Sequence, residues 1–500
     1  MIASAIGCTV QGLAGVPVTV EAHIANGLPH FAIVGLTDRA IQEARERVRS
    51  AVQNGGFEWP QRRITVNLAP AEVPKEGSGF DLAIAVAVLR AGESGIDSSG
   101  TAFVAELALD SSLRPVNGVL PMARCLAALG MRRLVVASQN AAEAALVDGL
   151  CVLPATRLQD VVEHLRGLLP IQPARPGAGA DAGPAGPDLA EVCGQASAKR
   201  ALEIAAAGGH NLLLTGPPGS GKTMMARALP SLLPDLEPDA ALEVSAIYSL
   251  RGLLRERPAM SLRPAFRAPH HSVSRSGLVG GGVGIAQPGE ISLAHRGVLF
   301  LDELCEFPRS HLEALRQPLE HHAVTIVRSR AAVTFPAEFV LVAAANPCPC
   351  GHLGDAKGCN CDLRQLQAYD ARVSGPIRDR IDLQVSVPRQ RFGDLFGGSE
   401  GEASAVVRGR VESARQMRSG RLADPAAGTA RTPSALSRSY RTAPAARRLL
   451  ARSGERLRLS ARGFVRVLRV ARTIADLAGD DGVGEAAIAE ALHYRGEMAA

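Results

Sequence analysis

The chain has 500 residues and a formal net charge of +6, and 46% of its residues are hydrophobic while only 3% are aromatic. This length exceeds what one hydrophobic core supports, so two to four domains are expected, and the scarcity of aromatic residues excludes a protein built on base-stacking platforms. No apolar run of about 18 residues occurs, and the N-terminus lacks a signal-peptide pattern. The sequence therefore predicts a cytoplasmic protein that does not bind membranes.

Residues 1–168 alternate between stretches typical of strands and stretches typical of helices. Residues 16–22 and 64–68 have the strand pattern, whereas residues 39–54 and 81–91 have the helix pattern. The alternation continues at residues 103–108, 122–129 and 134–137. This order predicts an α+β domain at the N-terminus of an α/β multidomain protein.

One segment of this region, PKEGSG at residues 74–79, precedes an expected helix. It resembles the segment that bears the nucleophile in the Lon protease domain, which has a ribosomal-S5-domain-2-like fold, and residues 114–128 resemble the segment that supplies its catalytic lysine. The Lon serine aligns with Gly79, and no lysine occurs in residues 117–122. Without a base, Ser78 stays an ordinary hydroxyl. We expect a Lon-like domain without peptidase activity.

Residues 169–187 are rich in Pro, Gly and Ala and show no hydrophobic periodicity. This composition is typical of a linker. We therefore expect a second folded unit over residues 188–395, followed by a basic helical part over residues 396–500.

The second unit begins with a phosphate-loop motif. Residues 211–215 are an apolar run typical of a buried strand, and the next eight residues follow the spacing Gly, four residues, Gly, Lys, Thr. Glycines let backbone N–H groups point at a β-phosphate, Lys222 places a charge between the β- and γ-phosphates, and Thr223 offers a hydroxyl to Mg²⁺. The chain has only four lysines, so a lysine here is a specific choice. The predicted nucleotide-binding residues are Gly216, Pro217, Pro218, Gly219, Ser220, Gly221, Lys222 and Thr223.

Two further apolar strands end in polar residues suited to ATP hydrolysis. Residues 297–304, GVLFLDEL, end in Asp302, which suits the hydration shell of Mg²⁺, and Glu303, which suits polarisation of the attacking water. Residues 339–345 lead to Asn346, whose amide can orient water and the γ-phosphate, as sensor 1 does in AAA+ ATPases. After a phosphate loop, these motifs predict an ATPase that uses ATP and Mg²⁺.

Arginines complete the expected site. Arg380, in SGPIRDRID at residues 374–382, has the position from which AAA+ rings supply an arginine finger to the neighbouring subunit, which implies an oligomer. Arg372 and Arg378 are rivals for this role, and a surface ion pair is the other interpretation.

The amphipathic stretch 459–477 has arginines on one face, and Arg462 near its start matches the sensor-2 arginine of an AAA+ lid. Its other arginines, Arg466, Arg469 and Arg472, are expected to face solvent or phosphate. Residues 408–472 hold seventeen arginines against three acids. This excess fits either a polyanionic partner or a solvated helical face.

Longer signatures resemble one family. These are RPAFRAPHHSVS (263–274), GGGVGIAQPGEISLAHRGVLFLDEL (280–304), ALRQPLE (314–320), NPCPCG (346–351) and SARGFVRVLRVARTIADL (460–477). They are similar to the Mg-chelatase-like AAA+ family called ComM or YifB, and the resemblance covers nearly the whole chain. It implies an AAA+ core with a parallel sheet, a C-terminal helical lid, and a hexameric helicase that promotes branch migration of DNA in recombination or natural transformation.

Other functions remain open at this stage. A chelatase-type ATPase that remodels a protein partner during metal insertion into a tetrapyrrole has the same ATPase motifs. A Lon-like protease is disfavoured by the missing serine and lysine, and a nucleotide-gated scaffold by the intact Glu303.

The resemblance also implies two elements that line the pore of a ring. Residues 277–290 would be the helix-2 insertion, and residues 325–334 the pre-sensor-1 hairpin with Arg328 and Arg330. Side chains two residues apart lie on one side of a strand, so a ring of such hairpins would line a channel with charge that matches DNA phosphates. An exposed hairpin in a basic protein is the simpler alternative.

Four of the nine cysteines are clustered as two Cys-x-Cys pairs, Cys348 with Cys350 and Cys359 with Cys361. Four thiolates on a glycine-rich loop can enclose a tetrahedral Zn²⁺, although the usual spacing within a pair is longer. Reduced free thiols are the alternative, and disulfides are less suited to the cytoplasm. The adjacent His270 and His271 are interpreted as local hydrogen-bonding residues without a metal.

Overall fold

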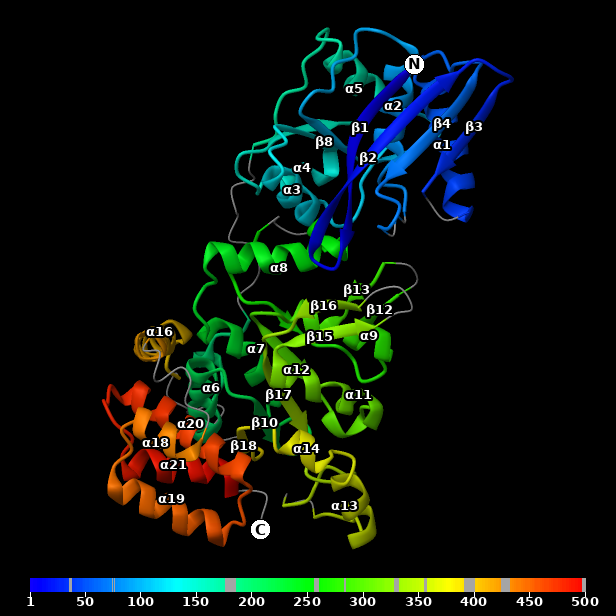
Figure 1. Cartoon of the computed structure of the whole chain (residues 1–500). Coiled ribbons are helices and arrows are strands. Elements are labelled where there is room, and N and C mark those ends of the chain that lie inside the picture. Colours follow the sequence, from blue (N-terminus) through cyan, green and yellow to red (C-terminus); the bar gives the residue numbers. More distant parts are fainter. Residues whose placement is uncertain are drawn as a thin grey trace.

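The computed structural model describes residues 1–35, 38–73, 75, 77–175, 186–255, 260–282, 285–327, 332–354, 358–390, 401–423 and 432–496. The described parts follow one another along an elongated molecule, with the N-terminal sheet at one end, a parallel sheet in the middle and the C-terminal helices beside it (Figure 1). Of the predicted linker, residues 176–185 lie outside the described residues. Residues before this gap pack on the N-terminal part, where the Ala174 N–H donates to the carbonyl of Val152 at 2.8 Å.

The N-terminal region contains a seven-stranded mixed sheet in the order β3-β4-β2-β1-β5-β8-β9. The first two strands form an antiparallel hairpin in which Ile2 lies opposite His23, and β1 also pairs in parallel with β5. The strands predicted at residues 16–22, 64–68 and 134–137 are confirmed. The strands of this sheet are β1 (Ile2–Gln11), β2 (Ala14–Ala25), β3 (His30–Val34), β4 (Arg63–Ala69), β5 (Thr101–Val104), β8 (Arg133–Ala137) and β9 (Cys151–Ala155).

Helices cover both faces of this sheet because side chains alternate along its strands. In β5, Phe103 packs into a core with α2, whereas Ala102 and Val104 pack into a second core with α3. Helix α2 is almost entirely buried, which explains its uniformly apolar sequence. The α+β architecture predicted for this region is confirmed. The helices are α1 (Asp38–Asn54), α2 (Asp81–Gly92), α3 (Val119–Ala128), α4 (Ala141–Ala144) and α5 (Leu158–Leu165).

The middle region is built on five parallel strands in the order β11-β14-β17-β10-β18. The central strands are short and apolar, and every residue of β14 and β17 is buried, as expected of a sheet covered on both faces. Helices α6 (Ala196–Gly208) and α7 (Lys222–Leu232) pack with one core, and α11, α12 and α14 flank the other. The strands are β11 (Phe266–Arg267), β14 (Val298–Leu301), β17 (Val340–Ala345), β10 (Leu212–Thr215) and β18 (Leu383–Ser386).

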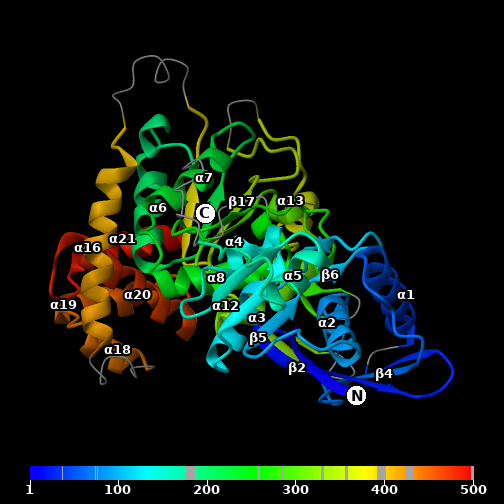
Figure 2. The same ribbon diagram turned by 90° about the horizontal axis from the view of Figure 1, so that it is seen from above.

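The C-terminal part is helical, and its helices share a hydrophobic core with α6 and the middle sheet. Figure 2 shows α16, α19 and α20 on the side of the molecule away from α1 and α2. Among the described helices, none has the length and apolar character needed to cross a membrane. The C-terminal helices are α16 (Ser404–Leu422), α18 (Pro433–Ser439), α19 (Pro444–Arg456), α20 (Ala461–Ala478) and α21 (Glu485–Gly496).

The N-terminal domain contacts the middle region through α8 (Pro238–Leu250). The N–H of Gly118 donates to the carbonyl of Ser249 at 2.9 Å, and the Ser249 hydroxyl donates to the carboxylate of Glu143 at 2.5 Å. Phe335, from a hairpin of the middle region, is fully buried in the same core as Val10. The hairpin is thus packed against the N-terminal domain.

Smaller elements complete the described fold. They are β6 (Glu106–Leu107), β7 (Leu113–Arg114), α9 (Arg275–Val279), β12 (Gly280–Gly281), β13 (Gln287–Pro288), α10 (Glu290–Leu293), α11 (Arg309–Ala314), α12 (Arg316–His321), β15 (Ala323–Val327), β16 (Ala332–Pro336), α13 (Leu363–Asp370) and α14 (Gly375–Arg378). Strands β15 and β16 form the antiparallel hairpin predicted near residues 325–334.

Candidate nucleotide site

The phosphate loop connects β10 to α7, and its glycines are required by its geometry. The N–H of Gly216 donates to the carbonyl of Ala345 at 3.2 Å, and a Cβ at Gly216 would lie only 2.2 Å from the carbonyl oxygen of Val387. Gly219 and Gly221 have φ values of 78° and 91°, a region that side chains disfavour. The loop is therefore confined between two neighbouring strands.

The polar atoms inside this loop suit a phosphate. The Lys222 ammonium donates to the loop carbonyls of Gly216 (2.7 Å) and Pro217 (2.9 Å) and lies 3.4 Å from Asn346 Oδ1. The Ser220 hydroxyl is buried without a hydrogen-bond partner among the described residues. Burial lowers the pKa of Lys222, although the charges of Asp302 and Glu303 oppose this shift. A buried cation, an unpartnered hydroxyl and a glycine loop fit the phosphates of a nucleotide.

The carboxyl ends of β10, β14 and β17 bring the expected magnesium ligands together. Because these strands are adjacent and parallel, the residues after each strand meet at one edge of the sheet. The Thr223 hydroxyl donates to Asp302 Oδ2 at 2.9 Å, and the N–H of Glu303 donates to Asp302 Oδ1 at 3.0 Å. A hydroxyl and a carboxylate side by side are the oxygen ligands that Mg²⁺ prefers. The fold thus assembles Lys222, Thr223, Asp302 and Asn346.

Glu303 has a neighbour that the sequence interpretation missed. Its carboxylate lies 3.4 Å from His271 Nδ1, and its backbone has a positive φ of 51°. His270 makes the local hydrogen bond expected of it, to the Ser272 hydroxyl at 2.7 Å, and the two imidazole rings lie 4.0 Å apart. No local sequence pattern reveals this contact, because it depends on the parallel pairing of β11, which precedes the histidines, with β14, which precedes Glu303.

Arg380 and Arg462 lie together at the opposite edge of the sheet. The Arg380 guanidinium is 4% exposed, pairs with Glu320 and donates to the carbonyl of Pro376 at 2.6 Å. Arg462 Nη1 lies 3.5 Å from the same Glu320 carboxylate, and Arg462 is 70% exposed. Strands β10 and β18 are parallel neighbours, and Arg380 precedes β18 whereas the phosphate loop follows β10. Arg380 and the loop are therefore separated by the length of one strand, about 13 Å. Arg380 thus lies at the end of the sheet opposite to its own phosphate loop, and the nucleotide role of Arg462 stays a prediction.

The rivals of Arg380 are paired elsewhere. Arg372 lies 2.9 Å from Glu306 and donates to the carbonyl of Cys305, and Arg378 pairs with Asp370. The choice of Arg380 as an arginine finger stays a prediction.

Asp382, which precedes β18, connects helix α20 to the amino ends of the sheet strands (the amino edge of the sheet). Its carboxylate accepts the N–H of Asn211 at 3.0 Å and the Arg466 guanidinium at 2.6 Å, and it lies 3.8 Å from His210. Burial alone would raise the pKa of Asp382, but the nearby His210 and Arg466 and the N–H of Asn211 lower it to about 2. The expectation that Arg466 faces solvent or phosphate is wrong, because its partner is an acid 84 residues away.

Arg472 is also internal. It is 2% exposed, lies 3.0 Å from Asp476 and donates to backbone carbonyls, including that of Asp481 at 3.1 Å. Helical spacing correctly predicted that Arg472 lies on the arginine-bearing face of α20. That part of the face is buried because the loop after α20 packs over it.

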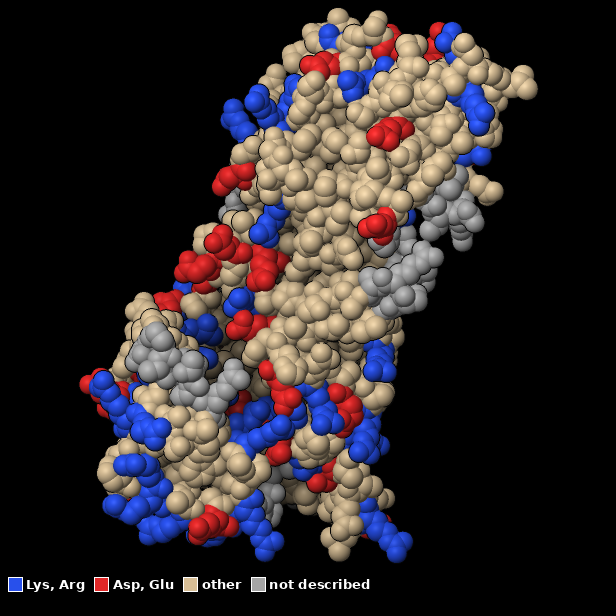
Figure 3. Space-filling model, viewed as in Figure 1, with Lys and Arg blue, Asp and Glu red and all other residues tan. Residues whose placement is uncertain are grey.

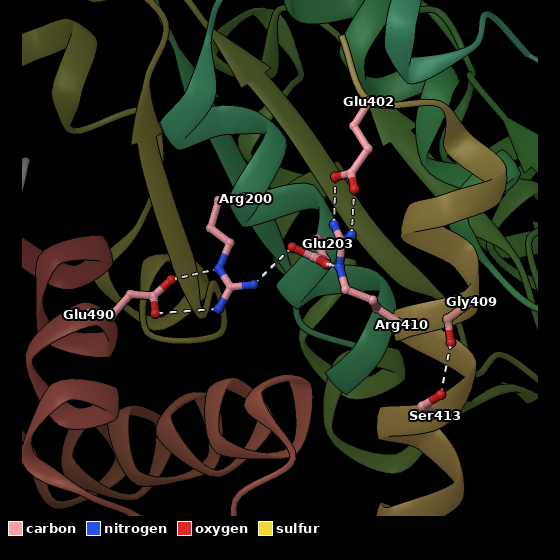
Figure 4. Close-up of polar contacts among 7 residues, drawn as sticks. All are labelled: Arg200, Glu203, Glu402, Gly409, Arg410, Ser413 and Glu490. Carbon is pink, nitrogen blue, oxygen red and sulfur yellow. Dashed lines mark hydrogen bonds and ion pairs between the residues drawn. The ribbon is translucent and has the colours of Figure 1, made fainter.

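A chain of ion pairs connects α6 to two C-terminal helices (Figure 4). Glu203 of α6 is 5% exposed and accepts Arg200 at 2.8 Å and Arg410 of α16 at 2.6 Å. Arg200 also reaches Glu490 of α21 at 2.8 Å, and Arg410 reaches Glu402 at 2.6 Å. Since α6 leads directly into β10 and the phosphate loop, this network ties the C-terminal helices to the site.

Two more arginines of α16 bind the carboxyl end of α6. Arg415 donates twice to the carbonyl of Ala206, at 2.9 and 2.7 Å, and Arg418 donates to the carbonyl of Gly208 at 2.6 Å. Cations at this end of a helix satisfy its free carbonyls and oppose its dipole. Arginines gather over the C-terminal helices on the face shown in Figure 3, yet part of this arginine excess holds the structure together.

The predicted DNA-binding residues Arg328 and Arg330 lie outside the described residues. The strands on either side are described, and the hydroxyls of Thr325 and Thr334 lie 3.1 Å apart across the hairpin. The DNA contacts stay predictions.

The four clustered cysteines come together immediately after Asn346. All are free thiols, and their four sulfur atoms lie within 4.8 Å of one another. The backbone N–H groups of His352 and Asn360 lower the pKa of Cys350 to about 6. The sequence-predicted cluster therefore exists as one compact group of thiols.

Comparisons with known proteins cover almost the entire chain. Three family models match successive segments: one described as magnesium chelatase, subunit ChlI, matches residues 188–395, one described as subunit ChlI of Mg-chelatase matches residues 20–140, and one described as magnesium chelatase, subunit ChlI C-terminal, matches residues 401–495.

Full-length relatives are found in several bacteria. Competence protein ComM of Haemophilus influenzae is 45% identical over 486 residues, which are 96% of this chain and 94% of the relative. YifB of Salmonella typhimurium is 44% identical over 490 residues, 97% of this chain and 95% of the relative. An uncharacterised protein of Mycobacterium tuberculosis is 45% identical over 496 residues, 98% of each chain.

Proposed function

Because the chain belongs to the ComM/YifB group of magnesium-chelatase-like AAA+ proteins, we propose that it is an ATP-hydrolysing motor that acts on DNA. The observation that carries the ATPase part is the convergence of Lys222, Thr223, Asp302 and Asn346 at one edge of a parallel sheet.

The proposed division of work follows from the site geometry. Lys222 and the loop N–H groups bind the phosphates, and Thr223 and Asp302 hold Mg²⁺, which offsets the negative charge that develops on the transferred phosphoryl group. Glu303 polarises the attacking water and Asn346 orients it. His271 sets the direction of the Glu303 carboxylate through their 3.4 Å contact.

The position of Arg380 and Arg462 supports a ring, which we propose to be a hexamer. Both arginines lie at the amino edge of the sheet, and their own phosphate loop lies at the carboxyl edge. In a head-to-tail ring, one edge of each subunit faces the opposite edge of the next. Arg380 would then leave Glu320 to reach the γ-phosphate of the adjacent subunit, and the exposed Arg462 would report nucleotide state to the lid.

The DNA part of the proposal rests on the printed name of the relative, a competence protein, and on the hairpin β15–β16. We propose that this hairpin, with Arg328 and Arg330, faces the channel of the ring and moves single-stranded or branched DNA, in branch migration during recombination or natural transformation. The chelatase description of the matching family models favours a second candidate, an ATPase that remodels a protein partner for metal insertion into a tetrapyrrole.

One experiment separates these functions. ATP hydrolysis by the full chain is measured without DNA and with single strands, duplex or a four-way junction, for the wild type and for Glu303→Gln. A DNA motor should hydrolyse ATP faster with at least one of these DNAs, and Glu303→Gln should bind nucleotide but lose about 100-fold or more of its hydrolysis rate.

Strong hydrolysis that no DNA changes would contradict the DNA motor and favour a protein-remodelling ATPase. Hydrolysis that survives in Glu303→Gln would contradict the proposed mechanism itself.

A further inference from the structure

The cluster of Cys348, Cys350, Cys359 and Cys361 has the geometry of a closed metal site. The sulfur of Cys348 lies 3.3 Å from that of Cys350 and 3.6 Å from that of Cys359, and Cys350 and Cys359 lie 3.6 Å apart. Zn–S bonds of about 2.3 Å in a tetrahedron require sulfur–sulfur edges of about 3.8 Å. The observed separations are close to these edges and far longer than the roughly 2.05 Å of a disulfide bond.

Backbone donors surround the sulfur atoms. The N–H of Leu353 donates to the Cys348 sulfur at 3.3 Å, and the N–H of Cys361 donates to the Cys359 sulfur at 3.4 Å. Donors of this kind stabilise the negative charge that four thiolates bring to a metal centre. With four protein ligands and no open position, such a centre is structural and not catalytic.

The segment that carries the cysteines has little else to hold it. Helix α13, which begins two residues after Cys361, has no buried residue. Cys348 itself is fully buried, whereas Cys350 is exposed and the other two are half-buried. Tyr369 of α13 packs against the core beside the middle sheet, but the loop and helix have no core of their own, and a bound metal stabilises structure of this kind.

This segment also touches the nucleotide site at two points. Cys348 follows Asn346 after a single residue, and Asn346 Oδ1 lies 3.4 Å from the Lys222 ammonium. Gly351 lies against Pro218 of the phosphate loop so closely that a Cβ at Gly351 would be 2.8 Å from the Pro218 ring. Anything that fixes residues 348–351 therefore fixes both the sensor amide and one side of the phosphate loop.

We propose that the four cysteines bind one Zn²⁺ and that this ion positions Asn346 and Pro218 for nucleotide binding. This inference rests on one part of the proposed function, namely that the phosphate loop binds the nucleotide. Loss of the metal releases residues 347–354 and 358–361, and the phosphate loop and the Asn346 amide then lose their fixed relation to Lys222.

Metal content is the first test. The full chain, purified without chelators or added metal, should contain one zinc ion per chain by elemental analysis. Cys350→Ser and Cys359→Ser should lose the zinc, whereas Cys151→Ser, which alters a half-buried thiol of the N-terminal domain, should retain it. Zinc at background level in the wild type would overturn the metal site.

Cobalt provides a readout that does not depend on the stability of a variant. Wild-type protein stripped of zinc and supplied with Co²⁺ should show the absorption bands of tetrahedral cobalt bound to thiolates. Their absence would also overturn the site.

The second test addresses the coupling to the nucleotide. Binding of a fluorescent ADP analogue to the wild type without DNA should weaken about 10-fold or more when zinc is removed, and recover when Zn²⁺ is added back. Unchanged affinity in the stripped protein would overturn the positioning role. Lys222→Ala should keep its zinc but lose binding of the ADP analogue. If this variant binds the analogue with normal affinity, the assignment of the nucleotide site is wrong, and the assignment of the metal site is unaffected.

Discussion

Two glycine-containing loops of this chain, one with Lys75 and Ser78 and one with Lys222 and Thr223, each precede a helix. The hydrogen-bond partners of their side chains differ. In the N-terminal domain, the Lys75 ammonium donates to the carbonyls of Pro70 and Val73, within five residues, and the Ser78 hydroxyl donates to Glu106. In the middle region, Lys222 lies beside Asn346, which is 124 residues away in the sequence. The Thr223 hydroxyl donates to Asp302, which is 79 residues away.

The difference shows what turns a glycine loop into a site. Lys75 is 3% exposed and its partners belong to its own loop, so it serves the fold of that loop. The absence of peptidase chemistry in the N-terminal domain stays a prediction. Lys222 also donates to carbonyls of its own loop, but it lies 3.4 Å from Asn346 after β17 as well, and the charges of Asp302 and Glu303 after β14 act on its pKa. These groups converge on a position where phosphate and Mg²⁺ fit.

Replacing each lysine in turn should have the largest difference in effect. Lys222→Ala should reduce ATP hydrolysis by about 100-fold or more, because the phosphates lose their buried cation. Lys75→Met retains the apolar stem, and its hydrolysis rate should stay close to that of the wild type. Steady-state hydrolysis and thermal unfolding of both variants decide the matter. A large loss of hydrolysis in a folded Lys75→Met protein would mean that the N-terminal loop takes part in ATP turnover.

A smaller effect should appear where the lid is attached. The pKa of Asp382 is about 2 in the folded protein and below that of an ordinary aspartate, so its carboxylate contributes stability fully above about pH 4 and loses it as the pH falls toward 2. This contribution is about 2 kcal/mol. In urea unfolding, Asp382→Asn should cost stability at neutral pH, and the difference from the wild type should shrink in acid.

Asp379→Asn, which alters an exposed acid of the same loop, provides the control and should change little. A pH-independent difference between Asp382→Asn and the wild type would contradict the assignment of the low pKa to this carboxyl.

The smallest effect concerns the carboxyl end of α6. Arg415→Met should lower the free energy of unfolding of the ATPase and lid by about 1 to 2 kcal/mol, because two carbonyl hydrogen bonds and a favourable helix-end charge are lost. The core between the N-terminal sheet and α2 contains only N-terminal residues among those described and should unfold unchanged. Arg408→Met, which removes a weak pair with Glu412 at 3.8 Å, is the matched control. Equal losses in both variants would show that α16 stabilises the protein only through its apolar face.

Local sequence patterns predicted the elements that bear the site. The phosphate loop, the strands before Asp302 and Asn346, and helix α20 follow from motifs and periodicity, which depend on neighbouring residues. Strand β1 was missed. Its sequence, IASAIGCTVQ, is rich in small residues, and it becomes a central strand only by pairing with β5, about a hundred residues later.

Charged partners were harder to foresee than apolar ones. Helical spacing correctly grouped Arg466 and Arg472, but nothing local revealed that Asp382 and the loop after α20 would cover them. The contact between His271 and Glu303 likewise depends on the parallel pairing of β11 with β14. Ion pairs between distant segments are set by the packed fold, and a sequence pattern does not contain that information.

The buried carboxylate of Glu203 also constrains how this protein can change over generations. It neutralises two guanidinium groups that come from different helices, Arg200 and Arg410 (Figure 4). Losing Glu203 first leaves Arg200 with Glu490 and Arg410 with Glu402, whereas losing both arginines first would leave a buried carboxylate without a cation. The order of substitutions at these three positions therefore matters, and lineages that have lost both arginines should have replaced Glu203 before the second arginine.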